Sequence, residues 1–575
     1  MAKVSNELLA EAFIKPIRFA LLIDDQFPTF SDLADNKFNA NLDNARAKAL
    51  FALCRGKGWL CDVGNRPAVA ERFENDNNLH QSDLLILDYN LDPSDQNDPT
   101  AALGIIQKLA SSDHFNLVIV YTDSDSRSVT REIAYSLGAG KEIPPEYLQS
   151  TNVSIEDLDP ETTDKLNEDF SQEIVDDYIV GASLKNSAAF RARLTASGVQ
   201  AGTIPHVLTQ WTKSRLETRL KPEILADRQT NGQVATSLAS PDGPFWVTRD
   251  NVFVAVVNKG ANAPEVLIER LKNAIEAWDP NPLLVMMMQA RASLEKAGTL
   301  ADHKVLDTDR LRAGWLLRVL LGKTTEDRRS NIADLYARLF ERLTTSIEPS
   351  IVDFGSRLIR PAKGEDAVDT AKSMARAPKT TAPAEIYHAL NEYLCSDACS
   401  DGGMTTGVVF RATKGERVQY WICVTPACDL VEGQNTGGWD GELHPTRPVA
   451  VARLTMIKTP ASVAKLLHAA TVGRHIFLYV DGIPVALEVA DKVSRQMSLE
   501  TIFLRDGGRI ADGKFMGHII DLGADGQPKI SELEFEAIAK LRPDYANRLL
   551  TQSGSERARI GVDFYNLPEP PEQKK

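Results

Sequence analysis

The stretch Ser82-Asp83-Leu84-Leu85-Ile86-Leu87-Asp88-Tyr89-Asn90-Leu91 decides the fold of the N-terminal part of the chain. Its four consecutive apolar residues end on a carboxylate, which is the pattern of a strand buried on both faces of a parallel sheet. An Asp at the C-terminal end of such a strand opens into the crevice where α/β sheets bind ligands. The stretch therefore predicts a parallel α/β sheet with Asp88 at its ligand-binding edge.

Two further apolar stretches end in a similar way. Residues 17–23 lead into Asp24-Asp25, and residues 116–121 lead into Thr122-Asp123. Polar loops and segments with helical spacing separate the three strands, which is the order of βαβ units. An acidic pair, a single Asp and a Thr are therefore expected at one edge of the sheet.

These strand ends, in this order, resemble the receiver domain of two-component response regulators, over residues 15 to about 200. The resemblance implies a CheY-like doubly wound parallel sheet and a role for each residue. Asp88 would be the phosphoacceptor, and Thr122 would contact the phosphoryl group. Asp24 and Asp25, together with Asp88 and the backbone carbonyl of Asn90, would hold Mg²⁺. The expected partner is a histidine kinase or a kinase-like ATPase.

A physical argument supports this interpretation without the family. A carboxylate accepts a phosphoryl group only if a hard cation offsets the charge on the carboxylates and the phosphate. The alternative is that Asp88 caps the next helix or binds a ribose, as in other α/β folds. Three matched strand ends favour the phosphoacceptor over this alternative.

Receiver domains also carry a characteristic Lys after their last strand. Residues 175–180 resemble that strand, but Gly181 stands where the Lys is expected. Lys185, four residues later, is the first candidate for this lysine, and Lys141 is a poorer one. The strongly acidic residues 141–173 are interpreted as a solvated insertion before this last strand.

The rest of the chain is predicted to form two further domains. Residues 205–360 are mainly amphipathic helix, interrupted by a β-hairpin within residues 245–257. Residues 361–383 contain few bulky apolar side chains and predict a linker. Short strands and two helices, near 461–470 and 531–551, predict that residues 384–575 form a β-rich α+β domain, with a spacing that suits a small barrel. Residues 1–204 would form the receiver-like domain, so the 575 residues make three domains.

Four of the six cysteines lie close together in the C-terminal domain: Cys395, Cys399, Cys423 and Cys428. Two thiol pairs could hold a structural zinc ion, with His388 as a substitute ligand. Their spacing is wider than the usual two residues, and packing of the thiols in the core is the favoured interpretation.

The segment Thr425-Pro426-Ala427-Cys428-Asp429-Leu430 resembles a Cys-Asp motif of uncharacterised bacterial proteins encoded with defence or restriction genes. A nucleophilic Cys needs a base or a positive field to lower its pKa. His444, His468 and His518 are all distant in sequence, so a structural turn is favoured over catalysis.

Composition limits the classes of function. A net charge of −14 argues against a broad nucleic-acid surface, and six cysteines give no disulfide framework. The N-terminus has no signal-peptide pattern, and no apolar run approaches the roughly eighteen residues of a membrane span. A cytoplasmic protein without a membrane anchor is therefore expected.

Three functions remain open. The preferred one is a signalling protein in which phosphorylation of Asp88 controls an atypical output in residues 205–575, with phage defence as one setting. The sequence shows neither a basic recognition helix nor a P-loop, so it points to none of the common output classes. The second is an effector enzyme built on a degenerate receiver scaffold around the cysteines and Asp429, and the third is a zinc-stapled adaptor. The preferred function does not require a dedicated catalyst, and the oligomeric state is left open.

Overall fold

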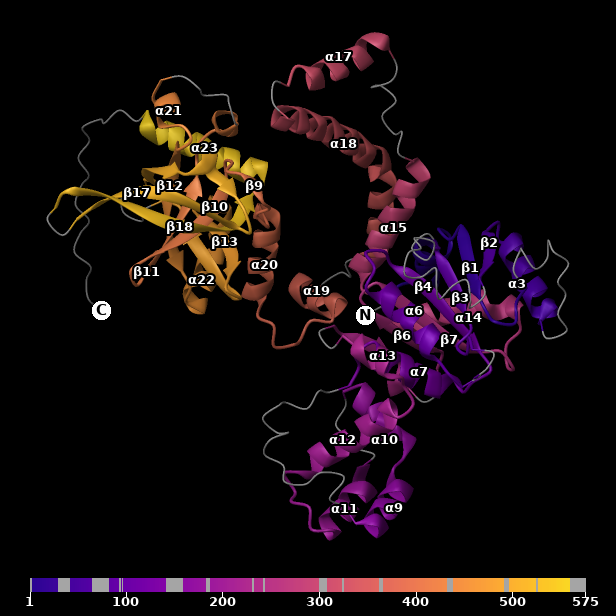
Figure 1. The fold of residues 1–575 in the computed structure, drawn as a ribbon. Helices are drawn as coiled ribbons and strands as arrows, with labels where there is room; N and C mark the ends of the chain where they lie inside the picture. Colours follow the sequence, from indigo (N-terminus) through magenta and orange to yellow (C-terminus); the bar gives the residue numbers. More distant parts are fainter. Residues whose placement is uncertain are drawn as a thin grey trace. The chain divides into compact units, whose positions relative to one another are not determined.

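The computed structural model describes residues 3–28, 42–64, 82–92, 95, 97–140, 159–181, 187–229, 232–240, 243–298, 308–322, 325–360, 366–431, 438–490, 496–523 and 526–558 (Figure 1). The chain divides into two compact units. The first comprises Met1–Arg318, Asn331–Glu365 and Ser373–Ala375, and the second comprises Val319–Ser330, Asp366–Lys372 and Arg376–Lys575.

A seven-stranded sheet forms the centre of the first unit, with the strand order β2-β1-β3-β4-β7-β6-β5. The first five strands in this order are parallel: β2 (Leu60–Gly64), β1 (Phe19–Ile23), β3 (Leu84–Leu87), β4 (Asn116–Thr122) and β7 (Val252–Asn258). The last two, β6 (Phe245–Arg249) and β5 (Val234–Thr236), continue the sheet in antiparallel pairing. Every residue of β3 and β4 is buried, which explains their uninterrupted apolar sequences.

Helices cover both faces of this sheet, as a doubly wound fold requires. Leu84 and Ile86 of β3 pack in one hydrophobic cluster with α3 (Asn44–Gly56) and α14 (Leu267–Trp278). Leu85 and Leu87 point to the opposite face, where they pack with α6 (Thr100–Ala110) and α7 (Ser126–Ser136). The predicted α/β class and the strands at Asp24, Asp88 and Thr122 are confirmed.

The predicted last strand at residues 175–180 is wrong, because this segment lies in helix α10 (Gln172–Ile179). Val175, Tyr178 and Ile179 are buried together, which follows the helical period rather than the alternation of a strand. Three further helices continue this region: α9 (Pro160–Asp169), α11 (Ala188–Ala196) and α12 (Ile204–Glu217). Leu166, Phe190 and Trp211 contribute to a hydrophobic cluster of their own, so the described part of the acidic insertion is folded.

The sheet continues beyond residue 204, which is the predicted end of the receiver-like domain. The predicted hairpin is present as β6 and β7, but β7 pairs in parallel with β4 along seven residues. The hairpin is therefore part of the N-terminal sheet and not an interruption in a separate helical domain.

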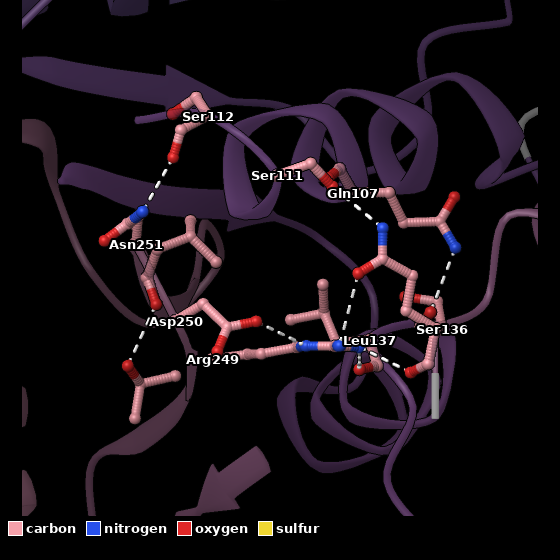
Figure 2. Close-up of polar contacts among 11 residues, drawn as sticks. Gln107, Ser111, Ser112, Ser136, Leu137, Arg249, Asp250 and Asn251 are labelled. Atoms are coloured by element: carbon pink, nitrogen blue, oxygen red, sulfur yellow. Dashed lines mark hydrogen bonds and ion pairs between the residues drawn. The ribbon is translucent and has the colours of Figure 1, made fainter. Parts of the chain in front are cut away.

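The turn between β6 and β7 lies where β7 begins, at the opposite edge of the sheet from Asp88, which follows the end of β3. Figure 2 shows the polar contacts that anchor this turn. The buried Arg249 guanidinium donates to the carbonyl oxygens of Leu137 and Gln229 and forms an ion pair with Asp250 at 2.9 Å. Asn251 Nδ2 donates to the Ser112 carbonyl oxygen at 2.7 Å. These bonds tie the hairpin to the segments that follow α6 and α7.

Three further helices follow in the chain: α15 (Pro282–Ala297), α17 (Asp309–Leu320) and α18 (Thr325–Leu358). Val285 of α15 and Phe354 of α18 are buried in the same cluster as α14. Parts of these helices thus complete the core of the sheet. Helix α19 (Ala367–Ala375) occupies part of the predicted linker at 361–383, which is therefore not wholly extended.

The second unit is β-rich and contains a closed antiparallel sheet. Its strands follow the order β11-β10-β18-β17-β15-β12, and β12 also pairs with β11, which closes the ring. These strands are β10 (Val408–Lys414), β11 (Arg417–Cys423), β12 (Arg447–Ile457), β15 (Ser498–Leu504), β17 (Lys514–Leu522) and β18 (Pro528–Leu541). The predicted barrel is therefore observed.

The other elements of the barrel unit are β13 (His475–Val480), β14 (Ile483–Glu488), α20 (Pro383–Cys395), α22 (Pro460–Leu467) and α23 (Pro543–Arg557). The helix predicted at 531–551 is wrong in its first half, which forms β18. It is correct in its second half, which forms α23.

Candidate functional site

The C-terminal ends of four parallel strands lie level with one another in the N-terminal sheet. Ile23 of β1 pairs with Leu87 of β3, Leu87 pairs with Val120 of β4, and Val120 pairs with Val256 of β7. The residues that follow each strand therefore meet at one edge, which is where parallel α/β sheets bind ligands.

Two carboxylates and one ammonium group meet at this edge. Lys259 Nζ lies 3.0 Å from Asp24 Oδ2 and 3.0 Å from Asp88 Oδ2. All three residues are nearly inaccessible, with exposed fractions of 3% for Asp24, 7% for Asp88 and 7% for Lys259. The lysine thus offsets part of the negative charge that folding buries at this edge.

Backbone hydrogen bonds hold the three side chains in place. The Lys259 amide donates to the Thr122 carbonyl oxygen at 2.7 Å, which continues the β4–β7 ladder by one residue. Asp88 Oδ1 accepts from the Tyr89 amide at 2.8 Å, and Asp24 Oδ1 accepts from the Gln26 amide at 2.9 Å. Each carboxylate thus keeps its second oxygen for Lys259.

The environment makes Asp88 harder to ionise than an ordinary Asp. Burial and the neighbouring charge of Asp24 raise the pKa of Asp88 to about 6, although Lys259 and the Tyr89 amide act in the opposite direction. Burial also lowers the pKa of the Lys259 ammonium, but Asp24 and Asp88 raise it by more, so Lys259 stays charged. One cation is therefore insufficient to balance this edge fully.

Thr122 and Asn90 stand beside these charges. The Thr122 side chain is fully buried, and its hydroxyl oxygen accepts from the Ser124 amide at 3.2 Å. Asn90 Nδ2 donates to the Ser124 hydroxyl oxygen at 3.1 Å. The loop after β4 is thus connected to the loop after β3, which carries Asp88.

The donor set fits a hard divalent cation. One carboxylate oxygen each from Asp24, Asp25 and Asp88 lies within 4.8 Å of the others. Oxygen ligands with several negative charges are those that Mg²⁺ prefers. Among the residues that the structure describes, this is the one group of three or more His, Cys, Asp or Glu side chains close enough to share an ion.

The geometry agrees with a comparison to known families. Residues 16–172 match the family model described as a response receiver domain. This part of the chain is a receiver domain. Searches of curated proteins and of solved structures give no match.

A receiver domain supports phosphorylation-responsive signalling of the response-regulator type, and receiver domains typically interact with histidine kinases and bind Mg²⁺. No described helix is long and apolar enough to cross a membrane.

The lysine that the structure places at this edge was missed in the sequence. Lys185 and Lys141 both lie outside the described residues, and Gly181 follows a helix rather than a strand. Lys259 follows β7, the strand that occupies the last parallel position of the sheet. The available signal was the buried run Val252–Val257 followed by Asn258-Lys259, which has the same form as the other strand ends.

The four C-terminal cysteines do not form a metal site in the part of the chain that the structure describes. Cys395 and Cys423 are buried in two different hydrophobic clusters, and Cys428 is exposed. His388 Nε2 forms a hydrogen bond with the Val485 carbonyl oxygen at 2.9 Å. The packing interpretation holds for Cys395 and Cys423, while the zinc interpretation has no support.

Asp88→Asn is expected to raise the free energy of unfolding in metal-free buffer at pH 8. A native pKa near 6 against an unfolded value near 3.8 means that wild type loses stability as the pH rises from 4 to 6, because ionised Asp88 is disfavoured in the folded state. Asn does not titrate, so the advantage of the variant should widen by about 1 kcal/mol between pH 5 and pH 8. Urea unfolding of both proteins at the two pH values measures this difference. A gap that stays constant or narrows would contradict the raised pKa.

Proposed function

We propose that this protein is a phosphorylation-controlled signalling protein in which Asp88 accepts the phosphoryl group. The observation that carries the proposal is the pair of 3.0 Å contacts from Lys259 Nζ to Asp88 and Asp24 at the ends of neighbouring parallel strands. Asp24, Asp25 and the backbone carbonyl of Asn90 would hold Mg²⁺ together with Asp88. The cation, when bound, supplies the charge that the phosphoryl group and three carboxylates need.

In the proposed reaction the ionised Asp88 carboxylate attacks phosphorus. A new Oδ–P bond forms while the bond from phosphorus to the donor breaks, and the donor leaves with the electron pair. The donor is a kinase phosphohistidine or a small acyl phosphate. Lys259 already contacts Asp88 Oδ2, so its ammonium group is placed to bond an oxygen of the arriving phosphoryl group.

Thr122 is proposed to sense the modified Asp88. It ends the neighbouring strand, its side chain is buried, and its carbonyl oxygen already accepts from the Lys259 amide. A hydroxyl that turns toward a phosphoryl oxygen would give up its contact with the Ser124 amide. Because Asn90 also forms a hydrogen bond with Ser124, this rotation of the Thr122 hydroxyl would also affect the loop that follows Asp88.

A network of hydrogen bonds and ion pairs supports a route from Asp88 to the helical region α9–α12. Tyr89, next to Asp88, donates its hydroxyl to Glu132 on α7 at 2.7 Å. Glu132 also pairs at 2.9 Å with Arg219, which follows α12. A second buried link joins Arg131 of α7 to Asp176 of α10 at 2.6 Å. We propose that phosphorylation changes the surface that helices α9–α12 offer to a partner.

The remaining parts of the proposal concern the partners and the output. A histidine kinase or kinase-like ATPase would supply the phosphoryl group. A role of the output in phage defence stays a prediction that rests on the Cys428-Asp429 motif alone.

Asp88→Asn should abolish phosphorylation, because the amide nitrogen and oxygen cannot act as the carboxylate nucleophile. The test is to incubate the full-length protein with acetyl phosphate and Mg²⁺ and to follow the gain of one phosphoryl group by intact mass. Asp123→Asn is the matched control, since Asp123 is an exposed carboxylate at the end of the neighbouring strand. The control should label at the rate of wild type. Equal labelling of Asp88→Asn and wild type would refute the assignment.

A further inference from the structure

Helix α17 up to Arg318 and the part of α18 from Asn331 to Leu343 form an arm of the first unit, and many of their large apolar side chains are exposed. None of the described residues of α17 is buried, although the helix carries three leucines and a tryptophan before Arg318. An isolated helix of this length is marginal in water, so a stable α17 needs apolar surface packed against it. The part of α18 that belongs to the first unit begins at Asn331, and Figure 1 shows the helix running from α15 away from the sheet.

Large apolar residues of the arm are exposed to an unusual extent. Tyr336 is 56% exposed and Phe340 is 61% exposed, and their rings stack on each other at 6.4 Å. Six exposed residues of the arm that belong to the first unit are Leu311, Leu316, Leu317, Ile332, Tyr336 and Phe340. At about 200 Å² for a large side chain, these residues leave on the order of 600 Å² of apolar surface in water. This equals or exceeds the largest apolar patch of a typical monomer.

The order of apolar residues along α18 changes where the helix reaches the core. Ile332, Tyr336, Leu339 and Leu343 follow the alternating four- and three-residue spacing of a coiled-coil seam. Beyond them, Ile347 and Phe354 continue the apolar stripe and are buried, Phe354 in the hydrophobic core beside the sheet. The same helix thus uses residues near its C-terminus for its own core, while Ile332 and Tyr336 of the seam are exposed and Leu339 and Leu343 are half-buried.

We propose that this seam pairs with the same seam of a second copy of the chain, in antiparallel orientation. The spacing from Ile332 to Leu343 is four, three and four residues, which reads the same in both directions. A twofold axis between Ala337 and Arg338 would therefore place Tyr336 beside Leu339 of the second copy. It would also place Ile332 beside Leu343 of the second copy. Such self-complementarity is what a twofold interface requires.

Charge and area also favour a second copy as the occupant. The chain carries a net charge of −14, so most surfaces of two copies repel each other. The seam is locally neutral, with Asp334 and Glu341 balanced by Arg338 and Arg342. Covering the apolar set on two copies would bury on the order of 1,200 Å², the lower end of a specific protein–protein interface.

An ion pair and a hydrogen bond hold the two helices of each arm together. Arg318 of α17 pairs with Asp334 of α18, and Asn331 Nδ2 donates to the Arg318 carbonyl oxygen at 2.9 Å. Each copy therefore brings two joined helices, and two arms would form a four-helix arrangement. Leu311, Leu316 and Leu317 of α17 would gain cover in that arrangement.

The test is sedimentation velocity on the full-length chain over a range of concentrations. Wild type is expected to form a dimer at low micromolar concentration, and Ile332→Ser with Tyr336→Ser should weaken association at least 100-fold. Val352→Ser is the matched control, because Val352 is an exposed apolar residue on the same helix outside the seam. It should leave the dissociation constant within about twofold of wild type.

Two further measurements keep the result decisive. Circular dichroism and labelling with acetyl phosphate, compared with wild type, show whether the double variant is folded. A wild-type chain that stays monomeric at 50 µM or so, or a folded double variant that dimerises like wild type, would overturn the proposal. A monomer whose α18 amides are protected from hydrogen exchange would also overturn it, because another part of the same chain would then cover the arm.

Discussion

Lys259→Met is expected to destabilise the protein by about 3–5 kcal/mol in metal-free buffer at pH 8. Methionine fills a similar volume but removes the cation that lies 3.0 Å from both Asp24 and Asp88. The two carboxylates would then be buried without their ammonium partner. Because Asp88 can take up a proton, the loss should be smaller at pH 5 than at pH 8. Urea unfolding at the two pH values measures both effects.

Mg²⁺ should restore part of the stability that Lys259→Met loses, since the cation would bind the same carboxylates. The matched control is Lys272→Met, because Lys272 is more than a third exposed and pairs with Glu269 only at 3.7 Å. An exposed pair of this kind contributes less than about 1 kcal/mol. If the two variants lose the same stability, Lys259 does not act as the charge balance of this site.

A fragment of residues 1–204 is expected not to fold, whereas a fragment of residues 1–360 should unfold cooperatively. The shorter fragment lacks β7, so β4 would lose a partner along seven residues, and the buried Phe253 and Val254 would be missing from the two sides of the sheet. It also lacks Phe354 of α18, which completes one of these cores. The expected difference is the presence or absence of a folded state.

Thermal unfolding followed by circular dichroism, with proton NMR dispersion as a second probe, separates the two fragments. The 1–360 fragment is the control for expression and for handling of a truncated chain. Cooperative unfolding of the 1–204 fragment at the midpoint of the longer one would show that β7 is dispensable. The N-terminal sheet would then fold without β7 and Lys259.

The sequence by itself determined the α/β class and most of the candidate site. Asp24, Asp88 and Thr122 each follow a short apolar run, and the burial of such a run on both faces of a sheet is written into consecutive residues. The strand order is also the one that successive βαβ units produce. These features depend on local pattern, so a single sequence was sufficient to predict them.

Segments whose apolar residues fit either a strand or a helix were less well determined. Residues 175–180 carry enough apolar side chains for a strand, yet they form α10, because Val175, Tyr178 and Ile179 find a core at helical spacing. The first half of the helix predicted at 531–551 forms β18, where pairing with both β10 and β17 outweighs the local preference. In each case neighbours distant in sequence select between two conformations that the local pattern allows.

The sequence marks the strand that ends before Lys259, but tertiary structure decided that this lysine belongs to the site. Lys259 lies 235 positions from Asp24, and the helical region α9–α12 separates it in the chain from β4. Its strand looks like half of an isolated hairpin until its pairing with β4 is known. Local pattern predicts that a strand exists and where it ends, but hydrogen bonding to a neighbour decides which sheet it joins. That pairing brings Lys259 to Asp88, and no property of the residues around Lys259 specifies it.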